Sequence, residues 1–167
     1  GGFDERFGQA WREDSDLWFT LLERLNGDGH LRLVYAPEAL VVHPVRPAPW
    51  GISLRQQRKS MYNALLYKKH PDLYRQRLGP VTPWRYYATV ATALAAVGAL
   101  AAGRRRLARV SGLAWALLTA RFFVQRLRGT SRRPGHVLEM AVTSPLIPFL
   151  SVYWRLRGAF RFRVPFL

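Results

Sequence analysis

Gly1-Gly2-Phe3-Asp4-Glu5-Arg6-Phe7 opens the chain, and Arg12-Glu13-Asp14-Ser15-Asp16-Leu17 follows after a short interval. Within the second stretch, three acids fall in four positions. The whole chain has 167 residues and a formal net charge of +16. A cluster of carboxylates in so basic a chain needs an explanation, either as the cap of a helix or as a functional site.

The residues around and after this cluster predict one helix and two short strands. Asp14 or Ser15 can cap a helix over residues 14–26, in which leucines recur at helical spacing until a Gly-rich turn ends the pattern. The apolar runs Leu31–Ala36 and Ala39–His43 then have the composition of β-strands. The first part of the chain is therefore expected to be α/β.

A proline-rich linker, residues 44–50, leads to a predicted second helix over residues 54–69. This helix is apolar on one side and basic on the others, a pattern typical of helices that lie on an anionic bilayer. The alternative is a helix packed on its own domain with a solvated basic face.

The second half of the chain alternates long apolar runs with arginine clusters. After residue 80 there are fourteen Arg, no Lys and one Glu. This alternation favours a membrane with anionic headgroups over the nucleic acid that a pI near 11.5 would also allow. We therefore expect two parts, residues 1–79 and an all-α transmembrane or interfacial region at residues 80–167. The candidate segments in this region are Tyr86–Gly103, Val110–Gln125 and Val137–Trp154.

Tyr86–Gly103 is the cleanest of these candidates, with eighteen uncharged residues. As a helix it would be about 27 Å long, close to the ~30 Å hydrocarbon core. Arg121 interrupts the second segment, and the third contains an acid and two prolines, so we expect the third to lie in or near the interface. If the first two segments form a simple hairpin, Arg104-Arg105-Arg106 lies on the other side of the membrane from residues 1–79. That placement goes against the positive-inside tendency.

The acids at positions 13, 14 and 16 have two explanations that their spacing does not separate. Acids in the first turn of a helix satisfy free N–H groups and complement the helix dipole. The functional explanation is a carboxylate base held at a helix start and aimed at a substrate hydroxyl.

Several short pieces occur here in a fixed order: Gly1-Gly2-Phe3-Asp4-Glu5, Phe7, Glu13-Asp14-Ser15-Asp16-Leu17, Glu23-Arg24-Leu25 and Pro37-Glu38-Ala39-Leu40-Val41-Val42-His43. Together they resemble the C-terminal half of the catalytic domain of family 2 glycosyltransferases of GT-A type. The resemblance covers about the first 43 residues. It implies that residues 1–79 complete an α/β GT-A domain and that the enzyme transfers a sugar from a nucleotide-diphosphate sugar to an acceptor hydroxyl.

The resemblance also implies roles for individual residues. Asp14 matches the general base of the family, and His43 matches a residue that helps hold the divalent cation, Mg²⁺ or Mn²⁺, or the diphosphate. The alternative for His43 is a histidine at a strand end bonded to the backbone. Arg58 and Lys59 are candidates for contacting a donor diphosphate or a lipid phosphate, or else are surface charges. The expected acceptor-binding residues are Glu13, Gly2, Phe3 and Asp4.

The sequence also departs from the family. The nucleotide-binding half and its Asp-x-Asp metal motif precede this segment in relatives, so we expect a fragment that lacks donor binding and turnover by itself. Asp14-Ser15-Asp16 lies in the acceptor motif and is not that metal motif. The Gln-x-x-Arg-Trp motif of processive synthases has no counterpart, since the nearest stretch, Arg55-Gln56-Gln57-Arg58-Lys59, lacks the tryptophan.

The combined expectation is a membrane-associated glycosyltransferase on the cytoplasmic face of a bacterial inner membrane, acting in envelope or lipid-linked glycan synthesis. Its expected partners are a nucleotide-diphosphate sugar, a glycan or lipid-linked acceptor and anionic lipids, with no nucleic acid. The alternative is a non-catalytic basic membrane-binding or scaffold protein whose acids are helix caps.

Overall fold

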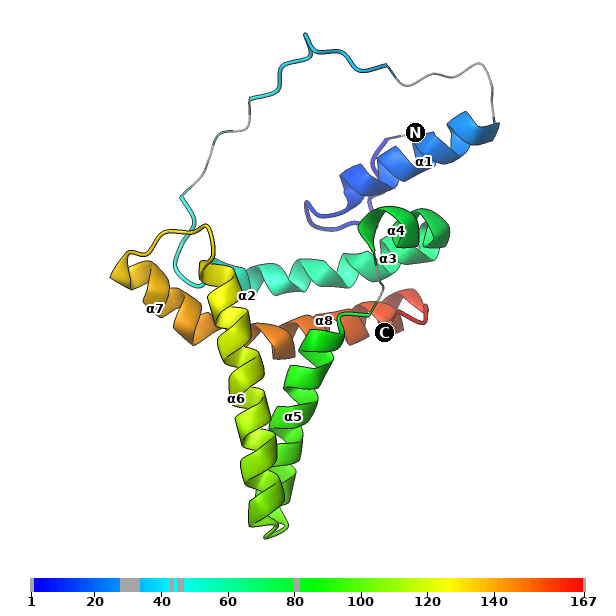
Figure 1. Ribbon diagram of the computed structural model, residues 1–167. Coiled ribbons are helices and arrows are strands. Elements are labelled where there is room, and N and C mark those ends of the chain that lie inside the picture. Colours follow the sequence, from blue (N-terminus) through cyan, green and yellow to red (C-terminus); the bar gives the residue numbers. More distant parts are fainter. Residues whose placement is uncertain (1, 28–33, 43, 45–46, 80–81, 167) are drawn as a thin grey trace.

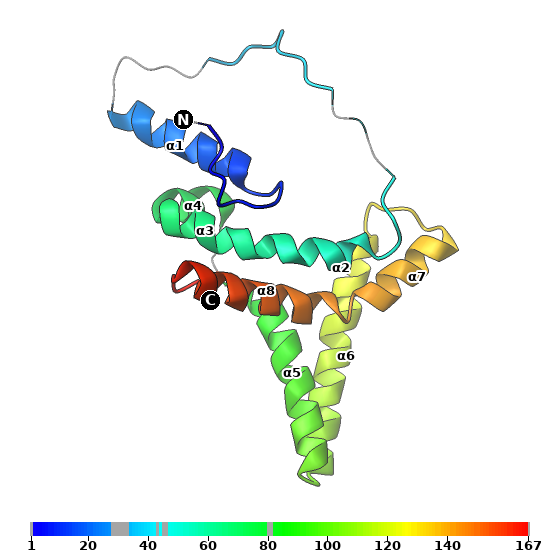
Figure 2. The same cartoon turned by 180° about the vertical axis from the view of Figure 1, so that it is seen from behind.

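The structure is a computed structural model, and it describes residues 2–27, 34–42, 44, 47–79 and 82–166. The helices α2, η1 and α3 run alongside α8, and these four elements form a unit that we call the platform. Helices α1 and α4 lie over one side of the platform (Figures 1 and 2). A hairpin of α5 and α6 projects from the other side. The helices of the described ranges are α1 (Glu13–Gly27), α2 (Ile52–Gln56), the 3₁₀ helix η1 (Gln57–Met61), α3 (Tyr62–Lys69), α4 (Pro71–Leu78), α5 (Trp84–Ala101), α6 (Arg105–Leu127), α7 (Pro134–Thr143) and α8 (Ile147–Phe162).

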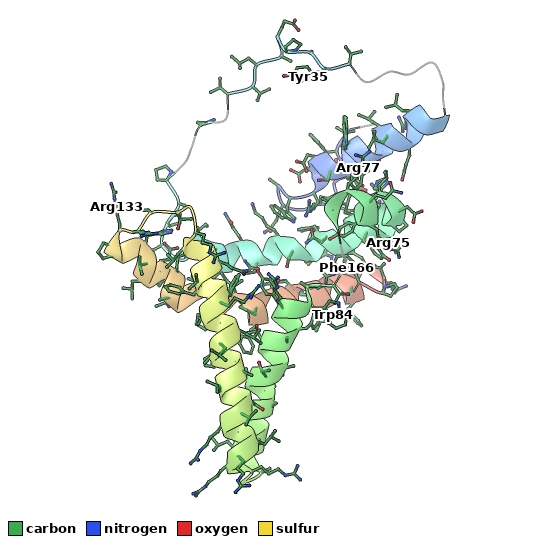
Figure 3. The ribbon with its side chains drawn as sticks, viewed as in Figure 1. Tyr35, Arg75, Arg77, Trp84, Arg133 and Phe166 are labelled. Carbon is green, nitrogen blue, oxygen red and sulfur yellow. The ribbon has the colours of Figure 1, made fainter. Side chains whose placement is uncertain are left out.

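The expected α/β fold, as the C-terminal portion of a GT-A domain, is wrong, because the described residues form helices and no β-strand. Residues 34–42, the described part of the two predicted strands, run as an extended segment with one turn, and Tyr35 projects away from the helices (Figure 3). Their apolar side chains are exposed. A strand needs a partner that pairs its N–H and C=O groups, and the described residues offer this segment none.

The hydrophobic core lies where α1, α3, α4 and α8 meet. Leu65 and Leu66 of α3 are fully buried at its centre, and Phe7 and Phe19 belong to the same cluster. Burying a side chain of this size contributes about 1.5–3 kcal/mol. The apolar side of the expected 54–69 helix is thus packed against the chain itself, which leaves only its basic sides for any other surface.

The end of the chain is anchored in this core through Phe166, which is fully buried (Figure 3). The rings of Tyr67 and Tyr74 lie 5.3 and 5.5 Å from the Phe166 ring. The guanidinium of Arg155 stacks on that ring at 3.7 Å, a cation–π contact from α8. Arg163 has a φ of 51°, the left-handed conformation that lets the chain turn back after α8.

The hairpin and the bent pair after it correspond to the three apolar segments of the sequence. Tyr86 of α5 and Phe122 of α6 make an edge contact at 5.4 Å. Among the described helices, α6 is the one long and apolar enough to cross a membrane. Tyr86–Gly103, expected to be the cleanest span, forms most of α5 (Trp84–Ala101), which has 18 residues and is long enough but not apolar enough to count as a crossing helix. The third segment forms α7 and α8, which are long and apolar enough to cross a membrane only when they are taken together as one pair, bent by 50°.

Polar contacts fix the hairpin to the platform. Arg126, near the end of α6, donates through Nη1 to the hydroxyls of Thr143 at 2.7 Å and Ser144 at 2.9 Å. Its Nη2 donates to Ser53 Oγ on α2 at 3.2 Å. The carboxylate of Glu139 on α7 accepts the backbone N–H just before α2 at 2.8 Å. One arginine therefore ties α6, α7 and α2 together, which sets the direction in which the hairpin leaves the platform.

Candidate functional site

The first turn of α1 contains all three acids of the sequence cluster, and the structure gives them different surroundings. Asp14 is exposed, and its Oδ1 accepts hydrogen bonds from the N–H and hydroxyl of Ser15 at 2.6 and 3.3 Å. Glu13 is half-buried, and its Oε2 has no hydrogen-bond partner in the described part of the chain. Both line a hollow of about 140 Å³ formed by residues 10–15. Asp14 therefore supplies the solvent-exposed carboxylate of this hollow, whereas the unpartnered oxygen of Glu13 is buried.

The backbone before this turn is held in an unusual conformation. Arg12 has a φ of 77°, in the left-handed region that residues with a side chain rarely adopt. Its carbonyl accepts the N–H of Asp16 at 2.8 Å, which starts the helix. Its Nε donates to Asn63 Oδ1 at 2.7 Å, and Trp11 Nε1 donates to the same oxygen at 3.3 Å. Asn63 of α3 thus holds the residues that aim Glu13 and Asp14, and such imposed strain is common at functional sites.

Asp16, in contrast, is buried and fully engaged. Its exposed fraction is 3%, and its two oxygens contact Lys69 Nζ at 2.6 Å and His70 Nε2 at 3.1 Å. The other ring nitrogen of His70 contacts Glu23 at 2.8 Å. The ring of Phe19 packs edge-on against His70 at 5.7 Å. Asp16 therefore joins α1 to the end of α3 and is not available to a substrate.

Asp4 belongs to the same charged cluster. Its carboxylate accepts hydrogen bonds from Arg6, the closest at 2.6 Å, and from Lys69 Nζ at 2.7 Å. The Arg6 side chain, helped by Lys69, holds the pKa of Asp4 well below its ordinary value of 3.8, although partial burial opposes the shift. Lys69 therefore bridges Asp4 and Asp16 and fixes the N-terminal segment to α1 and α3.

The expected acceptor-binding residues fall in two places. Gly2 and Asp4 line a groove of about 500 Å³ with Asp16 and Lys69, whereas Glu13 lines the hollow at residues 10–15. Phe3 is 61% exposed and lines neither. The structure thus does not gather these residues into a single pocket in the described part of the chain.

The two basic residues proposed for phosphate binding point to different neighbours. Lys59 Nζ lies 6.0 Å from the centre of the Trp11 ring, beside the hollow at the start of α1. Arg58 instead stacks over Trp154 of α8 at 5.8 Å. Only Lys59 is brought next to the acidic turn.

The described residues do not form a site for the Mg²⁺ or Mn²⁺ that the resemblance implies. They contain no group of three or more His, Asp or Glu side chains arranged to hold a metal ion. The carboxylates of Asp4 and Asp16 are already bridged by Lys69. His43, the predicted ligand, lies outside the described residues.

Sequence reasoning missed Lys69 and His70, which organise the charged cluster. The available signal was charge complementarity: α3 ends in Lys68-Lys69, His70 follows directly, and α1 begins with acids. No local pattern indicates that these two ends meet, since more than fifty residues separate them.

In comparisons with known proteins, no family model, no curated protein and no solved structure matches this chain.

Proposed function

We propose that this chain is part of a membrane-bound enzyme of the family 2 kind, which transfers a sugar from a nucleotide-diphosphate sugar to an acceptor hydroxyl. Asp14 is the general base. The observation that carries the proposal is that the acids differ in their partners and in their exposure. Asp4 and Asp16 are committed to Lys69, whereas Asp14 is exposed at the start of α1 with Oδ2 free of hydrogen bonds in the described residues.

The chemistry needs one carboxylate of this kind. A sugar hydroxyl is a poor nucleophile, so a base must take its proton while the bond from its oxygen to the anomeric carbon forms. The bond from that carbon to the diphosphate breaks, and the nucleoside diphosphate leaves with the electron pair. Asp14 Oδ2 receives the proton, and the hydrogen bonds from Ser15 keep Oδ1 fixed.

The surroundings of Asp14 support this role. Asn63 holds Trp11 and Arg12, so the acidic turn is oriented by contacts outside its own helix. Lys59 supplies a positive charge beside Trp11, which is suited to a phosphate group near the base. Arg58, stacked on Trp154, contributes to packing between η1 and α8.

The arrangement of the helices supports attachment to a membrane, which we assign to the cytoplasmic face of a bacterial inner membrane. The hairpin projects from the side of the platform opposite to α1 (Figure 1), and α6 is long enough to cross. Two helix layers, α3 and α8, lie between the acidic turn and the hairpin side, a thickness of roughly 20 Å. A glycan carried on a lipid, or another envelope glycan, can reach across these layers.

The test uses the intact protein in its native membranes, supplied with a panel of radiolabelled nucleotide-diphosphate sugars. Asp14→Asn keeps the shape of the side chain and removes the base, so sugar incorporation should fall roughly 10²-fold or more. Asp72→Asn, an equivalent change at an exposed acid of α4, should leave incorporation unchanged. Incorporation near the wild-type level by Asp14→Asn would show that Asp14 is only a helix cap. Membranes with the wild-type protein that transfer no more sugar than membranes without it would favour a non-catalytic scaffold.

A further inference from the structure

A groove lies between the first half of α5 and the second half of α6, on the platform side of the hairpin. It encloses about 640 Å³, large enough for a lipid headgroup and the start of its chains. Figure 3 shows Trp84 at the end of α5 that adjoins the platform. The walls are formed by Trp84, Arg85 and Tyr86 of α5 and by Leu118, Arg121 and Phe122 of α6.

Two positive charges from different helices face this groove without a carboxylate to neutralise them. Arg85 and Arg121 are exposed, and no Asp or Glu is among the lining residues. Neither arginine takes part in an ion pair with the described acids, which pair with Arg6, Lys69, His70 and Arg75. The groove is therefore complementary to an anion.

The rest of the groove is mainly apolar, and its other polar residues are Thr82, Thr89 and Gln125. The contact between Tyr86 and Phe122 brings the two helices together beside it. Closer to the tip of the hairpin, both helices have exposed apolar side chains, with Leu94 and Val97 on α5 and Leu113 and Leu117 on α6. A soluble polyanion has no apolar part that could bury these side chains, whereas the hydrocarbon chains of a lipid would cover them.

The position of Arg121 agrees with the same ligand. It lies six residues before the end of α6, about 9 Å along the helix. In a crossing helix this is below the bilayer surface, so its long side chain must reach back towards the headgroups. Arg85, the second residue of α5, starts at the surface. The guanidinium groups of both arginines can thus meet at headgroup depth, where planar donors bind phosphate oxygens well.

We propose that this groove binds a lipid with an anionic phosphate headgroup, with the phosphate held between Arg85 and Arg121 and the first part of its chains against Trp84 and Phe122. The inference rests on the membrane attachment within the proposed function. It does not depend on sugar transfer.

The test is native mass spectrometry of the full chain, purified in detergent and mixed with equal amounts of a phosphatidylglycerol and a phosphatidylcholine of the same chain length. The wild type should retain the anionic lipid in preference to the neutral one. Arg85→Gln with Arg121→Gln should lower its retention at least fivefold. Arg132→Gln with Arg133→Gln, a matched loss of two exposed charges outside the groove, should retain it like the wild type.

Three results would overturn the proposal: equal retention by all three proteins, equal losses in both double variants, or equal retention of neutral and anionic lipid by the wild type. Short-chain phosphatidylglycerol should displace the bound lipid at a concentration at which inorganic phosphate does not. Equal displacement by the two competitors would show that the groove binds a free anion and not a lipid. A photo-crosslinking amino acid in place of Trp84 should label the anionic lipid in an otherwise unchanged chain, whereas the same group in place of Arg133 should not. This readout holds even if the double variant folds poorly, and labelling at both positions alike would contradict a groove.

These measurements separate the failure of this inference from the failure of the proposed function. Lipid retention in detergent needs neither membrane crossing nor transfer, so it stands if Asp14→Asn proves fully active. Extraction of the chain from membranes by alkaline carbonate would remove the membrane attachment on which both proposals rest.

Discussion

Gly158 of α8 lies directly against the backbone of Met61 at the end of η1. A Cβ atom built on Gly158 would be 2.4 Å from the Met61 carbonyl oxygen and 3.0 Å from its Cα. Contacts this short with backbone atoms cannot be relieved by a side-chain rotation. The platform therefore depends on the absence of a side chain at this crossing, because any side chain would push α8 away from η1.

Gly158→Ala should destabilise the protein by roughly 1–3 kcal/mol, the usual cost of overpacking a close interface. Chemical unfolding in detergent micelles, followed by tryptophan fluorescence, would measure the change. Gly112→Ala in α6 is the matched control, since a Cβ there meets nothing within 4 Å. That variant should be unchanged or up to about 1 kcal/mol more stable, because alanine favours a helix over glycine. Equal stability of the two variants would contradict the close crossing.

The burial of Asp16 makes a second prediction about stability. Asp16→Ala leaves Lys69 with Asp4 as its remaining partner and His70 without its Nε2 contact, so it should cost roughly 1–3 kcal/mol, the usual cost of leaving a buried polar group unpaired. Asp72→Ala removes an exposed pair with Arg75 and should cost about 0–1 kcal/mol. Both are measured by chemical unfolding. A loss at position 16 no larger than the loss at position 72 would mean that the cluster contributes nothing to holding α1.

Local patterns predicted those parts of the fold that local interactions determine. The helix expected at residues 14–26 is α1 at 13–27, because its leucine spacing lies within one stretch, although Asp14 and Ser15, the expected caps, lie inside the first turn. The expected hairpin segments correspond to α5 and α6 for the same reason. The strands expected at 31–36 and 39–43 failed in their described part, because a strand is stabilised by a neighbour that local sequence does not specify.

The candidate site divides in the same way. Asp14 at a helix start follows from sequence alone. The commitment of Asp16 to Lys69 and His70 and the anchoring of Trp11 and Arg12 by Asn63 join residues more than fifty positions apart. Such pairings depend on how α1 packs on α3, and no spacing within either helix encodes them.

The low pKa of Asp4 gives a prediction about pH. Because the folded-state pKa is lowered by Arg6 and Lys69, the stabilisation is fully present above the ordinary pKa of 3.8. It is lost as the pH falls from there through the lower folded-state value. The difference in unfolding free energy between the wild type and Asp4→Asn should be constant from about pH 7 to 5 and should shrink below about pH 4. A difference that instead grows with acidification, or that disappears near neutral pH, would contradict the pairing with Arg6 and Lys69.

The direction of the hairpin gives a prediction about topology, and the chain is suited to the experiment because it has no cysteine. If the hairpin crosses the membrane, position 106, in the first turn of α6, lies on the opposite side from position 133, which comes just before α7 and is labelled in Figure 3. In cells whose outer membrane is permeabilised and whose inner membrane is intact, a membrane-impermeant maleimide should label Arg106→Cys and not Arg133→Cys. In inverted inner-membrane vesicles the pattern should reverse. Both residues are exposed arginines, so each variant is a control for the reactivity of the other. Labelling of both positions from one side only would place the hairpin in one leaflet and the triple-arginine loop on the cytoplasmic face, as the positive-inside tendency favours.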